Sequence, residues 1–364
     1  MLRAVRSFSL LAGGILGFSL LNGCGAVDQP AVESVGSGPE AAASDVVVKL
    51  TTATRSLGAR DDVQVTVTLT NVSDHAVSLL RYHTVLDGIR ENLFTVTRDG
   101  APVQYLGRVY KRAEPQASDY ISLSAGESIS RTVSLAAAYD FSATGRYSVS
   151  HTGVVKHSAV TFASNNVDLW VEGRANVLPE ESGAGAVAQF TTTALSTTSC
   201  TSSQASAISS AVSGATTYSS NAVNYLTNTT PSGTPRYKTW FGTYSSSGWN
   251  TAKTHYTNIR NAFQTQNVVV DCSCTDTGTY AYVYPTQPYK IYVCGAFWSA
   301  PNTGTDSRAG TLVHEMSHFN VVASTDDWAY GQSAAKSLAI SNPSKALDNA
   351  DSHEYFAENN PAQN

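Results

Sequence analysis

Two histidines four residues apart flank a glutamate in the run His314-Glu315-Met316-Ser317-His318. On a helix, residues at this spacing lie on the same face, so both imidazoles can bind one Zn²⁺ while the glutamate points toward a water molecule. The alternative is a helix with two unrelated surface or core histidines. The pattern predicts a zinc site with Glu315 directed at the water of the metal.

A catalytic zinc keeps three protein ligands and one open position, so the histidine pair needs a third partner. Asp326 and Asp327 lie shortly downstream, followed by Tyr330, and a carboxylate there can return to the metal after a short loop. The alternative for one of the two aspartates is an N-cap ahead of a helix from Trp328 to Ala339. For Asp326 the N-cap is favoured over metal binding.

The elements around this motif predict a helix-dominated α+β domain. Asp306 or Ser307 can cap the helix that carries the motif. Further helices are expected over Gln204–Leu226 and Thr251–Phe263, and the last third of the chain is again helical. Two runs between them, YAYVYP and KIYVC, have strand character.

Four cysteines lie in the same C-terminal half: Cys200, Cys272, Cys274 and Cys294. An even number in an exported chain indicates two disulfides rather than a metal site. A bridge between Cys272 and Cys274 is sterically poor. The spacing leaves two pairings open: Cys200 with Cys272 and Cys274 with Cys294, or the crossed alternative.

The N-terminal half has a different pattern, with period-two runs of β-branched residues separated by turns. The runs are VVVKLTTA, VQVTVTLTNV, NLFTVTRDG, SISRTVSL, RYSVSHTGVV and VDLWVEG. They predict an antiparallel β-sandwich over residues 45–172. Residues 173–197 are rich in Gly, Ala, Ser and Thr and predict a linker with a processing site, followed by a catalytic domain over 198–364.

The composition fits a soluble two-domain protein. The 364 residues are 42% hydrophobic and 14% charged, with a net charge of -5. No long basic run is present, so nucleic acid is not an expected partner. We expect a monomer that acts on protein or peptide substrates.

Residues 1–23 are typical of an export signal, because Arg3 and Arg6 precede a short apolar run. The run ends at Leu21-Asn22-Gly23-Cys24, which resembles the lipobox of bacterial lipoproteins, although Asn22 is unusual there. The alternative is an ordinary signal peptide with a chance cysteine. We expect an exported protein, either extracellular or a bacterial outer-surface or periplasmic lipoprotein. Contact with the membrane is expected only through a lipid anchor at Cys24.

The run GTLVHEMSHF, the following Thr-x-Asp-x-x-Tyr-Gly run and the four cysteines resemble the aspzincin metallopeptidases, the deuterolysin group. More narrowly, the chain resembles the peptidyl-Lys metalloendopeptidases, which cleave on the amino side of lysine. The likeness extends over nearly all of residues 198–364, including TPRYKTWFG, CGAFWSAP and DSHEYFAENNPA.

The resemblance implies a zincin-like catalytic domain that holds one Zn²⁺ through His314, His318 and Asp327. It implies hydrolysis by a zinc-activated water with Glu315 as general base and no acyl-enzyme. Tyr330 would donate a hydrogen bond to the oxyanion.

The same resemblance pairs Cys200 with Cys272 and Cys274 with Cys294. The chain departs from the family at Ser324, where glycine usually stands, and at Asp326, which places a second carboxylate beside the implied ligand.

Asp351 and Glu354 carry the expectation on substrate choice. Three residues apart on a helix, their carboxylates share a face and can line one pocket. The alternative is a solvated acidic helix surface. The resemblance implies that they receive the lysine that follows the scissile bond, so Asp351→Ala should reduce cleavage before lysine far more than slow cleavage elsewhere.

The segment before the linker is interpreted as a pro-domain that keeps the enzyme latent, and a basic loop at Lys111-Arg112 could occupy the specificity pocket. Two other functions stay open. One is a deuterolysin-like protease of different specificity. The other is an inactive surface lipoprotein that uses its β-sandwich as a binding module.

Overall fold

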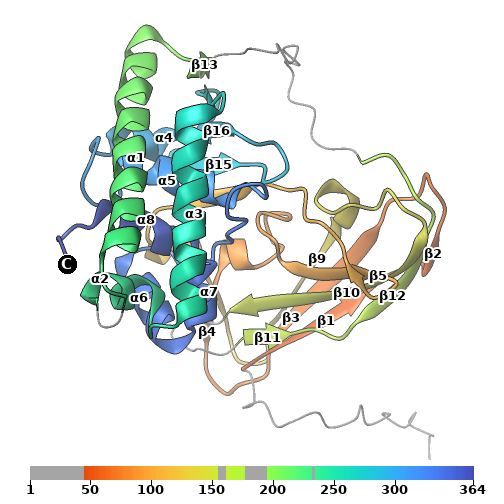
Figure 1. Cartoon of the computed structure of the whole chain (residues 1–364). Helices are drawn as coiled ribbons and strands as arrows, with labels where there is room; N and C mark the ends of the chain where they lie inside the picture. Colours follow the sequence, from red (N-terminus) through yellow and green to blue (C-terminus); the bar gives the residue numbers. More distant parts are fainter. Residues whose placement is uncertain (1–44, 155–160, 177–194, 232–233) are drawn as a thin grey trace, which may run out of the picture. The chain divides into compact units, whose positions relative to one another are not determined.

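The computed structural model describes residues 45–154, 161–176, 195–231 and 234–364 (Figure 1). The chain is a mixed α/β protein, with strands concentrated in its first half and helices in its second. The predicted export signal, Cys24 and most of the predicted linker lie outside the described residues. Within those residues, no helix has the length and apolar character needed to span a bilayer.

The first half, residues 45–176, is called the β region here. Its strands are β1 (Val46–Thr51), β2 (Ser56–Leu57), β3 (Gln64–Asn71), β4 (Val77–Leu80), β5 (Phe94–Arg98), β6 (Ala101–Pro102), β7 (Val109–Arg112), β8 (Tyr120–Leu123), β9 (Ser128–Ser134), β10 (Gly145–Val154), β11 (Thr161–Ala163) and β12 (Val167–Val171). Short 3₁₀ helices cover Arg81–His83, Ala117–Asp119 and Leu135–Ala137.

Five of the six period-two runs contain one of these strands, and β10 begins one residue before the remaining run, which confirms the strand predictions. The strands form sheets in the orders β1-β3-β9, β2-β12-β10-β5-β6 and β4-β8. Along β1, burial alternates strictly, with Val46, Val48 and Leu50 inside. These side chains join one apolar core with residues of the second sheet such as Phe94 and Tyr147, so period-two patterning places the two sheets on a shared core.

The second half, residues 195–364, is called the C-terminal region. Its helices are α1 (Ser202–Asn228), α2 (Pro235–Phe241), α3 (Ser246–Thr265), α4 (Gly295–Ser299), α5 (Arg308–His318), α6 (Gln332–Ser341), α7 (Pro343–Leu347) and α8 (Ala350–Glu358). Its sheet has the order β13-β14-β16-β15-β7. The four strands that the C-terminal region contributes are β13 (Ser196–Thr198), β14 (Val269–Asp271), β15 (Thr279–Val283) and β16 (Lys290–Val293).

Two predicted helices are confirmed, because α1 and α3 contain Gln204–Leu226 and Thr251–Phe263. The helix expected from Trp328 to Ala339 is wrong at its start. Helix α6 begins only at Gln332, after Gly331 adopts a φ of 83° that stops the helix from extending backward. The predicted linker also ends earlier than expected, because its last residues pair with β14 as part of β13.

Helix α5, which carries the histidine pair, is held in the core by α1 and α8. Helix α1 lies beside α3 in Figure 1 and presents small side chains, including Ala211 and Ala215, to the interior. A Cβ added at Gly214 would lie 2.8 Å from the Cβ of Ala309 in α5. The close approach of these helices therefore depends on small residues at their contact.

Disulfides join Cys200 to Cys272 and Cys274 to Cys294. This is the pairing implied by the family resemblance, and the crossed alternative is wrong. The first bridge ties the chain just before α1 to the end of β14, and the second ties the loop before β15 to the end of β16.

Strand β7 belongs to the first half of the chain but completes the sheet of the second half. It pairs antiparallel with β15, with Tyr110 opposite Tyr282 and Lys111 opposite Ala281. The loop conformation expected at Lys111-Arg112 is therefore wrong, because both residues lie in an edge strand. The two halves of the chain share this sheet.

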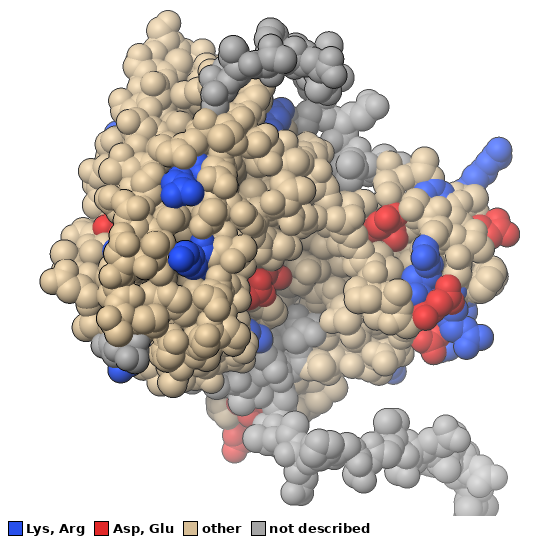
Figure 2. Space-filling model, viewed as in Figure 1, with Lys and Arg blue, Asp and Glu red and all other residues tan. Residues whose placement is uncertain are grey.

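Charged residues are unevenly spread over the face seen in Figure 2. The surface over α1 and α3 is mostly uncharged, whereas acidic and basic side chains gather together over the β region. Charges of both signs are mixed there.

Candidate metal centre and catalytic site

Helix α5 begins at a serine cap that a glutamate from α8 holds in place. The Ser307 side chain accepts a hydrogen bond from the Gly310 N–H, which confirms one of the two predicted caps. The Glu358 carboxylate accepts hydrogen bonds from the N–H and the hydroxyl of Ser307 at 2.9 and 2.7 Å. Burial raises the pKa of Glu358 to about 9. These contacts fix where α5 starts, and therefore how its two histidines face.

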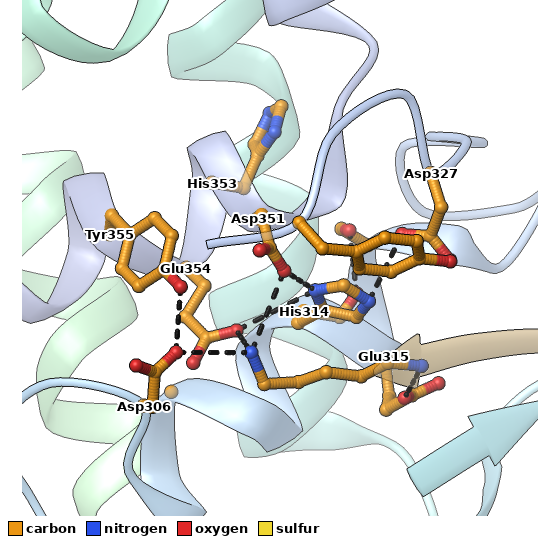
Figure 3. A network of polar contacts seen from close by, with 12 residues as sticks. Asp306, His314, Glu315, Asp327, Asp351, His353, Glu354 and Tyr355 are labelled. Carbon is orange, nitrogen blue, oxygen red and sulfur yellow. Dashed lines mark hydrogen bonds and ion pairs between the residues drawn. The ribbon is translucent and has the colours of Figure 1, made fainter. Parts of the chain in front are cut away.

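The two histidines of α5 and an aspartate from the following loop meet at one point. Figure 3 shows His314 beside Asp327. His314 Nε2 and His318 Nε2 lie 3.2 and 3.5 Å from Asp327 Oδ1. All three side chains are buried, with exposed fractions of 0%, 0% and 3%. The structure therefore brings together the three residues that the resemblance implies as ligands.

These three residues fit a tetrahedral zinc ion. Zinc bonds to nitrogen and oxygen of about 2.0 to 2.1 Å place neighbouring ligand atoms about 3.4 Å apart, and the ligand atoms lie at 3.2 and 3.5 Å. Both Nε2 atoms and both Asp327 oxygens are buried without a hydrogen-bond partner among the described residues. Such atoms are costly unless a cation satisfies them, so the donor set suits zinc.

The other nitrogen of each imidazole faces an acceptor. His318 Nδ1 donates a hydrogen bond of 2.7 Å to the Thr325 carbonyl oxygen. His314 Nδ1 lies 2.9 Å from Asp351 Oδ1. Partners of this kind hold the ring in place and leave the Nε2 lone pair free for a metal.

Asp326 takes no part in this group, and it does not cap a helix either. Its Oδ1 accepts a hydrogen bond of 2.9 Å from the Asp327 N–H. Its backbone N–H and C=O bond to Asp348 O and Ala350 N, which joins this loop to the start of α8. The N-cap expectation for Asp326 is wrong, because the helix it would cap starts six residues later, at Gln332.

The departure at Ser324 has a backbone explanation. Ser324 has a φ of 55°, a left-handed conformation that glycine adopts with less strain than other residues. The residue lies directly before Thr325, whose carbonyl orients His318. In this chain a serine adopts the left-handed conformation at the position where the family usually has glycine.

Glu315 and Tyr330 face a single peptide unit that β7 supplies. Glu315 Oε1 accepts a hydrogen bond of 3.2 Å from the Lys111 N–H. The Tyr330 hydroxyl donates a hydrogen bond of 3.0 Å to the Tyr110 carbonyl oxygen. Burial raises the pKa of Glu315 to about 8, and a cation at the neighbouring histidines would lower it again. The two groups thus lie on the two sides of one peptide bond.

Asp351 and Glu354 lie on the inward face of α8 and are fully buried, so the alternative of a solvated acidic surface is wrong. They surround the ammonium of Lys111, whose Nζ lies 2.6 Å from Glu354 Oε2 and 3.5 Å from Asp351 Oδ1. Asp306 Oδ1 lies 3.6 Å from the same nitrogen. We call this group of three carboxylates the acidic pocket.

The acidic pocket keeps its lysine charged. Burial opposes the ammonium form of Lys111, but Asp351 and Glu354 outweigh it and raise the pKa of Lys111 well above its ordinary value. For Asp351, burial opposes ionisation, but Lys111 and His314 outweigh it and lower its pKa to about 2. Asp351, Glu354 and His314 are also close enough together to bind a metal ion. The two carboxylates, however, already have the Lys111 ammonium as their counter-charge.

The sequence interpretation missed Asp306 as a member of the acidic pocket. Asp306 appeared only as a cap for α5, whereas its φ of 50° places it in a turn before the cap. Its Oδ1 accepts a hydrogen bond of 2.6 Å from the Tyr355 hydroxyl, which lies beside Glu354 in Figure 3. No local spacing connects Asp306 to α8, so its membership of the acidic pocket could not be predicted from the sequence pattern.

Comparison with known proteins identifies related peptidases. The family model described as lysine-specific metallo-endopeptidase matches residues 225–358. An extracellular protease of Aeromonas hydrophila is 44% identical over 318 residues, which cover 84% of this chain and 91% of that protein. A peptidyl-Lys metalloendopeptidase of Armillaria mellea is 39% identical over 321 residues, which cover 83% of this chain and 89% of that protein.

A solved zinc peptidase from Grifola frondosa is 54% identical and covers 45% of this chain and 100% of its own, with a TM-score of 0.44. The identity over most of the Aeromonas and Armillaria proteins, together with the family model, settles the relationship. The chain belongs to the aspzincin family of zinc metallopeptidases.

Proposed function

We propose that this protein is a secreted endopeptidase that cleaves peptide bonds on the amino side of lysine. One observation carries the proposal: a lysine side chain lies in the acidic pocket while its own N–H contacts Glu315. A substrate lysine bound in the same way would present the bond before it to the catalytic groups. The Armillaria relative is named a peptidyl-Lys metalloendopeptidase, which supports the same preference.

The acidic pocket favours lysine over arginine. The ammonium of Lys111 reaches Glu354 at 2.6 Å with the side chain 1% exposed, so an unbranched four-carbon chain is long enough to bring its charge to the carboxylate. A guanidinium is longer and planar and needs room for several parallel hydrogen bonds. An apolar side chain would leave buried carboxylates without a counter-charge, which is costly.

The residues of this site support each step of the proposed hydrolysis. Bound by His314, His318 and Asp327, zinc would polarise the scissile carbonyl and lower the pKa of the attacking water. Glu315 takes a proton from that water, and its Oε1 already faces the nitrogen that must receive a proton when the C–N bond breaks. Glu315 therefore acts first as base and then as acid.

Tyr330 stabilises the charge that develops on the carbonyl oxygen. Its hydroxyl donates to a backbone carbonyl directly before a lysine, where the scissile carbonyl would lie. Burial raises the pKa of Tyr330 well above its ordinary value, so the phenol keeps its proton and remains a donor. Donors of this kind act mainly in the transition state.

Zinc content and casein hydrolysis test the proposal together. We expect one zinc per chain, loss of hydrolysis with a chelator and recovery when zinc is returned. Mass spectrometry of the casein fragments should show new N-termini that begin with lysine. Zinc-bound protein that leaves casein intact would instead favour the inactive binding module, and cuts without regard to lysine would favour a deuterolysin-like protease.

We further propose that residues 45–172 form a β-sandwich pro-domain ahead of a helix-dominated catalytic domain over 198–364, with processing within 173–197. The support is that β7 lies on the catalytic groups, so another substrate cannot reach them. Comparing initial rates before and after cleavage within 173–197 tests latency. Equal kcat/KM for the two forms would contradict it.

Export through residues 1–23, acylation of Cys24 and a monomeric state are parts of the same proposal. The Aeromonas relative is named an extracellular protease, which supports export. Mass spectrometry of the mature N-terminus distinguishes an acylated Cys24 from an ordinary signal cleavage. Light scattering of the purified protein gives its oligomeric state.

A further inference from the structure

Strand β7 lies against the C-terminal region as an added edge strand. In the sheet order β13-β14-β16-β15-β7, the strand next to β7 is β15, and every other strand of this sheet comes from the C-terminal region. An extended segment that pairs with an exposed sheet edge is a common mode of peptide recognition, in which the backbone supplies affinity and alternate side chains enter pockets. Strand β7 therefore has the form of a bound peptide.

The Tyr110–Lys111 peptide unit and the Lys111 side chain contact the three groups that would act on or bind a substrate. The Tyr110 carbonyl oxygen accepts from Tyr330 at 3.0 Å. The Lys111 N–H donates to Glu315 at 3.2 Å. The Lys111 ammonium lies in the acidic pocket, 2.6 Å from Glu354.

This alignment depends on register, because successive side chains of a strand point to opposite faces. A shift of one residue would turn the Lys111 side chain away from the acidic pocket and move another carbonyl to Tyr330. The bulge in β15 between Thr279 and Ala281 lies opposite the step from Lys111 to Arg112. It brings Tyr280 within reach of the lysine, with Nζ 5.0 Å from the ring centre.

Contacts on both sides of Lys111 hold this register. Arg112 Nε lies 3.5 Å from Glu91 Oε1 in the β region. Before the bond, the Arg108 Nε donates a hydrogen bond of 2.6 Å to the Tyr284 hydroxyl of the C-terminal region. The peptide unit is thus fixed by ionic and polar anchors at both ends of β7.

We propose that the Tyr110–Lys111 bond is a substrate of this chain's own catalytic site and is cut within the same molecule. The inference rests on the proposed cleavage before lysine. Water adds its oxygen to the Tyr110 carbonyl carbon, the C–N bond breaks, and Glu315 carries a proton from the water to the Lys111 nitrogen. The products are a carboxylate at Tyr110 and an amine at Lys111, with no other reactant.

The cut does not by itself release either part of the β region. Strands before the bond pair with strands after it, in the pairs β3 with β9, β4 with β8 and β5 with β10. We therefore expect the two fragments to stay associated in native buffer and to separate only under denaturing conditions. Cleavage removes the covalent tether on β7, which lets the strand leave the catalytic groups.

The test uses the full chain, purified without zinc, to which zinc is then added. Samples are quenched in acid, denatured and analysed by mass spectrometry. We expect fragments that end at Tyr110 and begin at Lys111, formed at a rate that does not change over a tenfold range of protein concentration. The same samples are assayed with an external lysine peptide.

Variants distinguish cleavage of the Tyr110–Lys111 bond from proteolysis at other sites. Glu315→Gln should leave the bond intact. Lys111→Ala should lose this cut, while it still cleaves the external peptide once residues 173–197 have been processed. Lys49→Ala is the matched control, because Lys49 is an exposed lysine of the β region and its loss should change nothing. Circular dichroism shows whether each variant folds.

A second measurement does not depend on activity. In the uncut Glu315→Gln chain, acetylation of lysines followed by mass spectrometry should modify Lys49 at least tenfold faster than Lys111, whose side chain is 1% exposed. Equal rates would overturn the inference.

The cleavage data can contradict it in two further ways. A chain that hydrolyses the external peptide but keeps its Tyr110–Lys111 bond would overturn the inference and leave the proposed function standing. A cutting rate that rises in proportion to protein concentration would show cleavage between molecules. Failure of the zinc-bound protein to cut the peptide even after cleavage within residues 173–197 would instead overturn the proposed function.

Discussion

Asp351 Oδ1 lies 2.9 Å from Nδ1 of His314 and 3.5 Å from Nζ of Lys111. The same carboxylate thus orients a metal ligand and faces the lysine in the acidic pocket. Its Oδ2 accepts a hydrogen bond of 2.7 Å from the Gly331 N–H, next to Tyr330. Asp351 therefore connects substrate recognition, the metal ligands and the oxyanion donor.

This connection changes what is expected of Asp351→Ala. Losing a carboxylate that orients a metal-bound histidine typically weakens metal binding about 10- to 100-fold. We expect Asp351→Ala to lose zinc affinity by that factor and to slow cleavage at every site, not only before lysine. Zinc competition titration checks the first effect. Normal zinc affinity with a loss confined to lysine substrates would favour a role in specificity alone.

Glu354 provides the matched comparison, because it lies closer to the lysine ammonium and farther from His314, at 3.5 Å. Glu354→Gln keeps the size of the side chain and removes its charge. We expect about a 10²-fold loss in kcat/KM for lysine peptides, since breaking one partner of a buried charge pair is costly, with little change in zinc affinity. Parallel kinetics and zinc titration should show slower cleavage of lysine peptides in both variants but weaker zinc binding only in Asp351→Ala; weakened zinc binding in Glu354→Gln would contradict this division of roles.

Glu315→Gln should nearly abolish proteolysis while zinc stays bound. The general base is lost, which typically costs about 10²- to 10⁴-fold in rate, while His314, His318 and Asp327 are unchanged. Metal analysis and peptide hydrolysis on one preparation make the comparison. Turnover close to that of the unmodified protein would rule out Glu315 as the base.

The neighbouring aspartates should behave differently. Asp327→Ala removes a group whose Oδ1 lies 3.2 Å from His314 Nε2, so zinc retention should fall. Asp326→Ala should keep both metal and activity, because Asp326 contacts the backbone N–H of Asp327 and not the histidines. Dialysis against a weak chelator compares them. The reverse outcome would place the ligand one residue away.

Tyr330→Phe should lower kcat about 10²- to 10³-fold with little change in KM, because an oxyanion donor acts mainly as charge develops. The ring can keep its contact with Tyr82, whose ring centre lies 5.9 Å away. A higher KM with unchanged kcat would assign Tyr330 to substrate binding.

The sequence was informative where chemistry follows a helical spacing. Two histidines four residues apart had to share a face of α5, and the geometry places both Nε2 atoms beside one aspartate. The choice of Asp327 over Asp326 came from the family resemblance. Local propensity gave a wrong N-cap at Asp326, because an aspartate before an apolar helix is typical of an N-cap. In the structure, Gly331 delays the start of that helix to Gln332.

The placement of β7 could not be predicted in the same way. Lys111 and Glu315 are 204 positions apart, and no period links them. A strand of four residues at the edge of a distant sheet has too few side chains to show alternation, so Lys111-Arg112 looked like a loop. Asp306 was missed for the same reason, since its role depends on tertiary contact with α8.

The preference for lysine can be measured directly with three peptides that are identical except for lysine, arginine or leucine after the scissile bond. They are mixed in equal amounts with the zinc-loaded protein, with Glu315→Gln as control, and the products are followed by mass spectrometry. We predict that the lysine peptide is cut before its lysine at least tenfold faster than the other two. Equal rates for all three peptides would contradict the assignment of the acidic pocket as a lysine site.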